Sequence, residues 1–417
     1  GYKQTEVGVI PEDWDLQRMS SLTSLPIQNG VFNEPARKGR GCKLINVGDL
    51  YVVTPIDIQP LELFDANKVE VSRFGVFHGD IFFTRSSLTP DGIAYCNIYE
   101  KRQDVDVVFD CHIIRVRPNT KKIDPFFLFR YCTTYSARKY LVEHAKTTTM
   151  TTIDQSVIAN TPVPVPPLRE QHAIAAALSD VDSLLAKLDQ LIAKKRDLKQ
   201  AAMQQLLTGQ TRLPGFHGEW AVKRLGDLFE ITSSKRVFQS EWKSDGIPFY
   251  RARELAVLGE KGRVDNDLFI TKSLYESFKN AHGVPEVGDM LVTGVGTLGK
   301  VYVVPDEREF YFKDGNIIWF KIDGKLSADF LRQLYFTKVV LKQITDASAG
   351  TTVGTYTITG AKKTEIPFPS LAEQTAIVAV LTEMDTELSV LERRRDKTRA
   401  LKQGMMQELL TGRIRLV

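Results

Sequence analysis

The 417-residue sequence contains no apolar run close to the roughly 20 residues that are needed to span a bilayer. The opening segment, Gly1 to Gln4, has no apolar stretch like that of a secretory signal, so we expect a cytoplasmic protein without a membrane partner. Cysteine is scarce, since all four residues lie before position 133 and none forms a Cys-x-x-Cys pair. We therefore expect reduced, structural thiols rather than disulfides or a zinc site.

Motifs for catalysis are also missing. The six histidines are scattered, which argues against a metal site, and no Asn/Asp-Pro-Pro-Tyr loop of the adenine methyltransferase type is present. Residues 294–300 match a dinucleotide-binding pattern and most of a phosphate-binding loop. However, Val301 replaces the Ser or Thr that would hold magnesium, and the residues after it favour a strand rather than a helix. We predict a glycine-rich hairpin there, and no catalytic residue, metal ligand or cofactor in this chain.

The length and composition fit two folded domains, and an internal repeat shows how they are organised. The formal net charge of +4 permits a polyanionic partner without identifying one. Residues 168–213 align without a gap onto residues 371–416, and 23 of the 46 aligned positions are identical. Trp14 likewise matches Trp220. The chain is therefore a twofold repeat of units that are each about 205 residues long.

Each unit changes from strand-like to helix-like sequence after a proline-rich boundary, at 162–167 and at 367–369. Beyond each boundary, apolar residues recur at spacings of three and four, which predicts a coiled-coil seam. The seam residues are Ile174, Leu178, Val181, Leu185, Leu188 and Ile192 in the first copy, and Ile377, Leu381, Met384, Leu388 and Leu391 in the second. Gly209 and Gly412 stand where a C-terminal cap would. We expect two helices of roughly 40 residues that pair with each other.

The order of the segments predicts a circular arrangement. The segment from Gly8 to Trp14 resembles the one that follows the first helix, so the N-terminus supplies the start of a unit. Two similar units related by a pseudo-two-fold would place their helices antiparallel. The predicted fold class is α+β, with two mixed α/β domains joined by two long helices that form an antiparallel coiled coil. The predicted segments are a first domain at 1–165, a first helix at 166–208, a second domain at 209–368, and a second helix with the C-terminal tail at 369–417.

Alternating and apolar patterns place strands and helices inside the domains. Strands are expected at Val76–Thr84, Val107–Val116, Met290–Thr293, Val301–Val304 and Ile317–Lys321, and helices at Pro125–Tyr131 and Ala328–Phe336.

Basic and hydroxyl-rich loops recur in both units and supply our candidate DNA-binding residues. Arginine can bond two acceptors on guanine, and Ser and Thr can bond phosphates or base edges. The candidates are Arg37, Lys38, Arg40, Arg85, Ser86, Ser87, Lys146, Thr148 and Thr149 in the first unit, and Lys235, Arg236, Arg251, Arg253, Thr297, Lys300, Thr351 and Thr352 in the second. Any one of these loops alone fits a solvated turn better. Because such loops occur at corresponding places in both units, a role in DNA binding is favoured for the loops as a group rather than for any single loop.

The sequence resembles the specificity subunit of type I restriction-modification enzymes over nearly its whole length. The resemblance rests on the opening residues 2–14, on Pro-Pro-Leu-x-Glu-Gln at 166–171 with its counterpart at 369–374, and on Leu-Leu-Thr-Gly at 206–209 and 409–412. It implies two variable target recognition domains in a non-catalytic subunit that reads double-stranded DNA. It also implies two adenine methyltransferase partners that use S-adenosylmethionine and, optionally, two nuclease partners that use ATP and magnesium.

The two domains diverge much more than the helices, which predicts an asymmetric bipartite DNA target. Readers that face the same side of DNA about 34 to 36 Å apart would leave a gap of about 5 to 8 base pairs. Two other interpretations remain open, namely a coiled-coil scaffold that binds only proteins and an enzyme whose centre no motif reveals. Salt-dependent binding of duplex DNA would separate the scaffold from a DNA-reading subunit.

Overall fold

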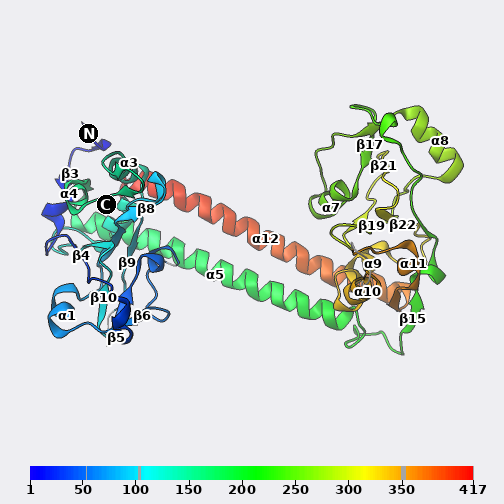
Figure 1. Cartoon of the computed structure of the whole chain (residues 1–417), viewed down its shortest axis with the longest axis horizontal. Coiled ribbons are helices and arrows are strands. Elements are labelled where there is room, and N and C mark those ends of the chain that lie inside the picture. Colours follow the sequence, from blue (N-terminus) through cyan, green and yellow to red (C-terminus); the bar gives the residue numbers. More distant parts are fainter. Residues whose placement is uncertain (53, 102–104, 349–353, 417) are drawn as a thin grey trace. The chain divides into compact units, whose positions relative to one another are not determined.

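The computed structural model describes residues 1–52, 54–101, 105–348 and 354–416, which fold into two compact units (Figure 1). The first unit comprises Gly1–Asp189 together with the residues from Arg393 onward, and the second comprises Gln190–Glu392. Both ends of the chain therefore belong to one unit, as the circular arrangement predicts. Each unit includes part of both long helices, so the units do not coincide with the four predicted segments, whose boundaries stay a prediction. Among the described residues, no helix combines the length and the hydropathy that are needed to cross a membrane.

The first unit is built on a four-stranded antiparallel sheet with the strand order β4-β11-β7-β9. Its strands are β4 (Gln28–Asn29), β11 (Ile113–Val116), β7 (Ile81–Thr84) and β9 (Cys96–Ile98). A second sheet pairs β5 (Lys38–Ile45) parallel to β10 (Val107–Phe109) and antiparallel to β6 (Glu62–Phe64). Every residue of β7 and β11 is buried, which explains their nearly continuous apolar sequence.

Smaller elements complete the first unit. They are β1 (Tyr2–Thr5), β2 (Gly8–Pro11), β3 (Asp15–Arg18), α1 (Lys68–Phe74), β8 (Ser86–Ser87), α2 (Pro125–Cys132), α3 (Tyr135–Glu143), β12 (Lys146–Thr147), β13 (Thr151–Thr152), α4 (Gln155–Asn160) and β14 (Pro162–Val165). Helix α2 begins where the sequence predicts, because Pro125 occupies its first turn and the Asp124 carboxylate accepts two of its free backbone N–H groups. The four cysteines are free thiols, as expected, and burial raises the pKa of Cys96 to about 12.

Two predicted strands need correction. The predicted strand Val107–Val116 is two strands in different sheets, because Asp110 to His112 form a turn between β10 and β11. The predicted strand Val76–Thr84 begins only at Ile81, because Gly79 adopts a φ of +88° in the turn that precedes it. Apolar residues lie close on both sides of each turn, so the overall hydrophobicity of these stretches did not mark the breaks.

The second unit repeats the topology of the first. Its four-stranded sheet has the order β16-β22-β19-β20, and its second sheet pairs β17 parallel to β21 and antiparallel to β18. The strands are β15 (Ala221–Arg224), β16 (Ile231–Thr232), β17 (Ile247–Tyr250), β18 (Phe269–Ile270), β19 (Met290–Thr293), β20 (Val301–Val303), β21 (Tyr311–Phe312), β22 (Ile317–Phe320) and β23 (Glu365–Phe368). The helices outside the coiled coil are α6 (Leu225–Leu228), α7 (Ala252–Lys261), α8 (Lys272–His282), α9 (Ala328–Leu334), α10 (Lys338–Ser348) and α11 (Ile358–Lys363). The repeat seen in the sequence is therefore a repeat of fold.

The long helices are α5 (Leu168–Leu206) and α12 (Leu371–Leu409), each of 39 residues (Figure 1). Within the first unit, Asp182 of α5 pairs with Lys402 of α12 and Asp189 with Arg395, so the two helices run antiparallel. Within the second unit, Lys195 pairs with Glu387 in the same sense. The predicted seam residues are buried or half-buried in both helices. The predicted coiled coil is therefore confirmed.

A buried cluster of Trp, Glu and Arg explains the Glu-Gln motif at the start of α5. Glu170 is 1% exposed and accepts hydrogen bonds from Arg415 Nε (2.7 Å), Arg415 Nη2 (2.8 Å) and Trp14 Nε1 (3.1 Å). Its neighbour Gln171 accepts from the backbone N–H of Asp124 at 2.7 Å and so fixes the entry to α2. The cluster ties the N-terminal and C-terminal segments of the first unit to α5.

The second unit contains the same cluster. Glu373 is 1% exposed and accepts from Arg212 Nε (2.5 Å), Arg212 Nη2 (2.6 Å) and Trp220 Nε1 (3.0 Å). Gln374 accepts from the backbone N–H of Ser327 at 2.8 Å, at the start of α9. The motif residues that duplicate in the sequence thus make equivalent contacts in the two units.

Candidate DNA-reading faces

The first predicted loop, at Arg37 to Arg40, is already engaged inside the protein. Arg37 donates to the Glu70 carboxylate and to the Asp65 carbonyl, and its guanidinium lies 4.6 Å from the centre of the Phe64 ring. The Arg37 guanidinium also holds the pKa of Glu70 below its usual range. Lys38 pairs with Glu62 at 3.0 Å and Arg40 with Asp65 at 2.9 Å. A DNA contact here would have to compete with these ion pairs.

The second and third predicted loops of the first unit come together on one small sheet. Strand β13 pairs antiparallel with β8, which carries Ser86 and Ser87, and with β12, which carries Lys146. Arg85 directly precedes β8 and is exposed. Among the described residues, its side chain forms no ion pair. Lys146 is 80% exposed and lies 3.8 Å from Asp154. Register aligns Ser86, Thr152 and Lys146, so candidates that are 60 residues apart in sequence share one face, whereas Ser87 pairs with Thr151 and points to the other face.

The turn between β12 and β13 completes this face. Thr148 and Thr149 are exposed within it, and the Thr148 N–H donates to the Met150 carbonyl at 3.1 Å. A cavity of about 490 Å³ adjoins the small sheet and is lined by Arg85, Ser86, His112, His144, Lys146 and Thr152, among others. This concave surface combines cations with hydroxyl groups, which is the chemistry that binds phosphates and base edges. Neither histidine is predicted from the sequence, because both lie outside the basic loops.

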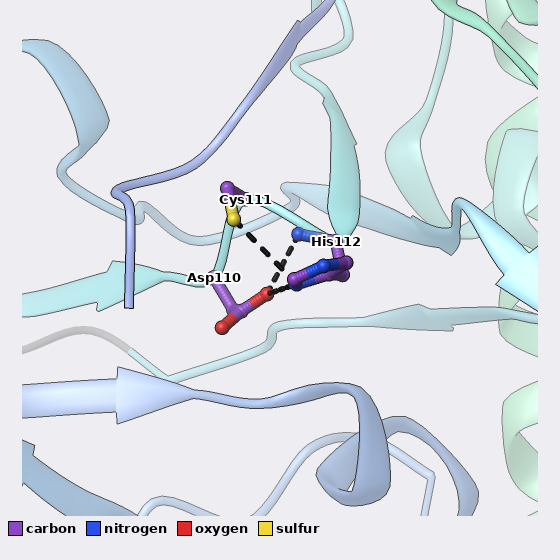
Figure 2. A group of neighbouring side chains, drawn as sticks. All are labelled: Asp110, Cys111 and His112. Carbon is purple, nitrogen blue, oxygen red and sulfur yellow. Dashed lines mark hydrogen bonds and ion pairs between the residues drawn. The ribbon is translucent and has the colours of Figure 1, made fainter. Parts of the chain in front are cut away.

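The turn that separates β10 from β11 positions one of those histidines (Figure 2). The Asp110 carboxylate is buried, and its Oδ1 accepts from the His112 backbone N–H at 2.6 Å and from the His112 ring at 2.8 Å. Asn33 donates to the other carboxylate oxygen at 2.7 Å. Cys111 Sγ lies 3.5 Å from His112 Nδ1, so three groups that can bind a metal stand within 4.8 Å of one another. No sequence pattern marks this group as a site, and the hydrogen bonds of Asp110 account for the geometry of the turn.

The second unit has a different distribution of free and engaged cations. Arg236 pairs with Asp314, and Lys300 pairs with Glu260. Arg251 donates to Glu254, within the cap of helix α7, and to Asp267. Within the part of the chain that the structure describes, the exposed candidates whose side chains form no hydrogen bond or ion pair are Lys235, Arg253 and Thr297. Thr351 and Thr352 lie outside the described residues.

Residues 294–300 form the predicted glycine-rich turn between the antiparallel strands β19 and β20. Gly296 and Gly299 adopt φ values of +77° and +73°, which explains the glycines without a bound nucleotide. The turn closes through a hydrogen bond from the Thr293 N–H to the Lys300 carbonyl at 2.9 Å.

Strand register identifies which residues are equivalent in the two units. Ile113 pairs with Thr84 in the first unit exactly as Ile317 pairs with Thr293 in the second.

The neighbours of these paired residues can then be matched between the two units. The Arg85 N–H donates to the His112 carbonyl at 2.9 Å, and the Gly294 N–H donates to the Asn316 carbonyl at 2.8 Å. Arg85 and His112 therefore correspond to Gly294 and Asn316. One scaffold carries different side chains at the same two positions of its candidate face.

Comparison with known proteins identifies the family. The family model described as "Type I restriction modification DNA specificity domain" matches residues 42–194 and 217–398, once in each repeat. The chain belongs to this family. The putative type I restriction enzyme MjaX specificity subunit of Methanocaldococcus jannaschii is 24% identical, over 100% of this chain and 97% of that protein.

Solved structures share the fold of this specificity subunit. The HsdS subunit from Thermoanaerobacter tengcongensis has a TM-score of 0.55 at 18% identity, over 97% of this chain and 98% of that one. A chain from a structure on complex assembly and conformational transition of the type I R-M system has a TM-score of 0.60 at 19% identity, over 97% and 99% of the two chains. This chain is therefore a DNA sequence-recognition subunit rather than a catalytic subunit, and the interpretation as a protein-binding scaffold is not favoured.

Proposed function

We propose that this specificity subunit reads an asymmetric bipartite DNA target, with each globular part contacting a different half-site. The observation that carries the proposal is the replacement of Arg85 and His112 by Gly294 and Asn316 at equivalent positions of one topology. Guanidinium and imidazole groups make contacts that a glycine and an amide cannot reproduce. Unlike side chains on matching scaffolds favour unlike half-sites, separated by a gap of about 5 to 8 base pairs.

The candidate contacts differ between the units. In the first unit, the small sheet and the cavity beside it support Arg85, Ser86 and Lys146 as the residues that meet DNA. In the second unit, exposure and the lack of internal ion pairs among the described residues support Arg253 instead of Arg251. A guanidinium that is free to form two hydrogen bonds is the side chain best suited to recognise guanine.

We further propose that the subunit acts in the cytoplasm with two adenine methyltransferase subunits and, optionally, two nuclease subunits. The relation to a chain from a type I R-M complex supports such an assembly. S-adenosylmethionine, ATP and magnesium would bind those partners. Methylation of an adenine within a duplex requires its extrusion from the base stack, a step that we assign to the methyltransferase.

The test is to sequence modified adenines in cells that express this chain with its methyltransferase and in cells that lack the chain. We expect one motif with two unlike half-sites and an unspecified gap. Arg85→Ala should relax the motif in one half-site only, and Arg253→Ala should relax it in the other. A continuous palindrome, or a loss of specificity in both halves from either substitution, would contradict the proposal.

A further inference from the structure

The candidate face of the first unit carries a loop that is four residues longer than its counterpart in the second unit. The N–H of Thr84 donates to the Tyr95 carbonyl at 2.9 Å, and the N–H of Tyr95 donates to the Thr84 hydroxyl at 3.0 Å. Thr293 and Lys300 form the same two bonds at the same distances. Ten residues lie between the first pair, whereas six lie between the second.

Equivalent contacts at the two ends of each loop locate the extra residues. These contacts join Ser86 to Thr152 and Val295 to Thr355 at the first end, and Thr84 to Gly92 and Thr293 to Thr297 at the second. The residues before and after the difference are thereby matched. The extra residues are Leu88–Asp91, and all four are exposed.

A side chain from a neighbouring helix fixes the longer loop. Arg138 of α3 donates from Nη2 to the Asp91 carbonyl at 2.7 Å and from Nη1 to the Ala94 carbonyl at 2.8 Å. Ala94 has a φ of +50°, an uncommon conformation for a residue with a Cβ, and the bond from Arg138 helps to maintain it. Within the loop, the Thr89 N–H donates to the Ser87 hydroxyl at 3.2 Å. The loop is therefore preorganised, which lowers the entropic cost of a contact with a ligand.

The preorganised loop presents Leu88 to solvent. Leu88 is 85% exposed, more than any other large apolar residue that the structure describes. The apolar residues of the shorter loop, Val295 and Leu298, are half-buried. A single exposed apolar residue is ordinary on a protein surface. Leu88 differs because it stands on a rigid loop that only one unit has, close behind Arg85 and Ser86 of the candidate face.

We propose that Leu88 is a specificity-determining residue of the first unit and contacts the C5 methyl group of a thymine in the major groove of its half-site. Leucine cannot form hydrogen bonds, and the thymine methyl group is the apolar feature that base pairs present in that groove. This inference rests on the proposed DNA-reading function and adds an apolar contact to the polar contacts proposed above.

The charge of the same loop favours the major groove. Asp91 is exposed in the extra segment, and its carboxylate is repelled by the phosphates and by the negative potential of a narrow minor groove. The major groove is wider, and a carboxylate there can accept a hydrogen bond from a cytosine amine. A leucine that acted as a wedge between base pairs would instead enter the minor groove and bend the DNA.

The experiment measures the dissociation constant of the full chain, by fluorescence anisotropy, for duplexes that carry its methylation motif. Each thymine of the motif is replaced in turn by uracil, which lacks only the C5 methyl group. The variants are Leu88→Ala, which removes the apolar contact, and Leu88→Met, which keeps it. Leu184→Ala is the matched control, because Leu184 is an exposed leucine of the first unit, at 39%, but lies in α5. Equal melting temperatures will show that the variants fold.

We expect uracil at one position to weaken wild-type binding about threefold to fivefold, which is the effect of one methyl group removed from contact. This position should lie in the half-site that Arg85→Ala relaxes. Leu88→Ala should bind the thymine and uracil duplexes equally there, whereas Leu88→Met and Leu184→Ala should keep the difference. Uracil at the other positions should affect wild type and variants alike.

An unchanged preference for thymine in Leu88→Ala would overturn the inference, as would a wild type that binds the thymine and uracil duplexes equally at every position. A wedge would also overturn it, and would appear as weaker binding of Leu88→Ala to all duplexes with a smaller DNA bend, measured by energy transfer between dyes at the duplex ends. In each case wild type would still prefer its motif. Failure of the proposed function would look different, because wild type would then bind DNA without sequence preference.

Discussion

Glu170→Gln should loosen the junction of the N-terminal and C-terminal segments with α5. The wild-type carboxylate is 1% exposed and accepts three hydrogen bonds, two of them from the Arg415 guanidinium. A glutamine keeps one acceptor oxygen and turns an NH2 group toward donors. Even with that oxygen at the Oε2 position, which keeps the bonds from Arg415 Nη2 and Trp14 Nε1, the bond from Arg415 Nε is lost and the NH2 group faces that donor. Breaking a buried ion pair costs about 3 to 5 kcal/mol. Because the Arg415 side chain is 26% exposed and keeps its pair with Asp13, we expect about 2 to 4 kcal/mol here.

Hydrogen exchange read by mass spectrometry can measure this locally, in peptides that contain Trp14 and the start of α5. The expected loss corresponds to exchange that is about 30- to 700-fold faster. Glu6→Gln is the control in the same unit, since Glu6 pairs with Arg18 but is 44% exposed. That substitution should cost less than about 1 kcal/mol. If Glu170→Gln changes exchange no more than Glu6→Gln does, the Trp–Glu–Arg cluster does not hold the segments together.

Two further predictions concern residues whose roles the structure separates. Arg253→Ala should weaken DNA binding by about 1 to 3 kcal/mol and leave the melting temperature unchanged. Arg251→Ala should instead lower the melting temperature, because the Arg251 side chain donates to the buried Glu254 carboxylate in the first turn of α7. DNA titration and calorimetry of both variants will show whether the roles are instead reversed. Glu70 has a lowered pKa because Arg37 donates to it, so its stabilising contribution is present above its ordinary range and is lost as the pH falls. The melting temperatures of wild type and Glu70→Gln should therefore differ at about pH 7 and converge below about pH 4, and a gap that is constant with pH would refute this assignment.

The candidate site could be predicted from sequence only in part. The composition of their loops predicts Arg37 and Arg85 equally as DNA-binding residues. Loop composition alone does not distinguish an exposed arginine from one that is paired inside the protein. Only the fold places Glu70 beside Arg37 and leaves the Arg85 guanidinium without an ion pair among the described residues. His112 escaped notice because a single histidine in an apolar stretch carries no signal until its neighbours in space are known.

The repeat, the two long helices, their antiparallel pairing and the family could all be predicted from the sequence alone. These features depend on local periodicity and on the duplication of residues 168–213 at 371–416, both of which are visible along the chain. Tertiary structure decided where strands break, as at Asp110, and which cations remain free for DNA. It also brought the loop at Arg85 beside the loop at Lys146 through strand pairing. Such contacts join residues far apart in the sequence, and their energies depend on burial and distance rather than on local composition.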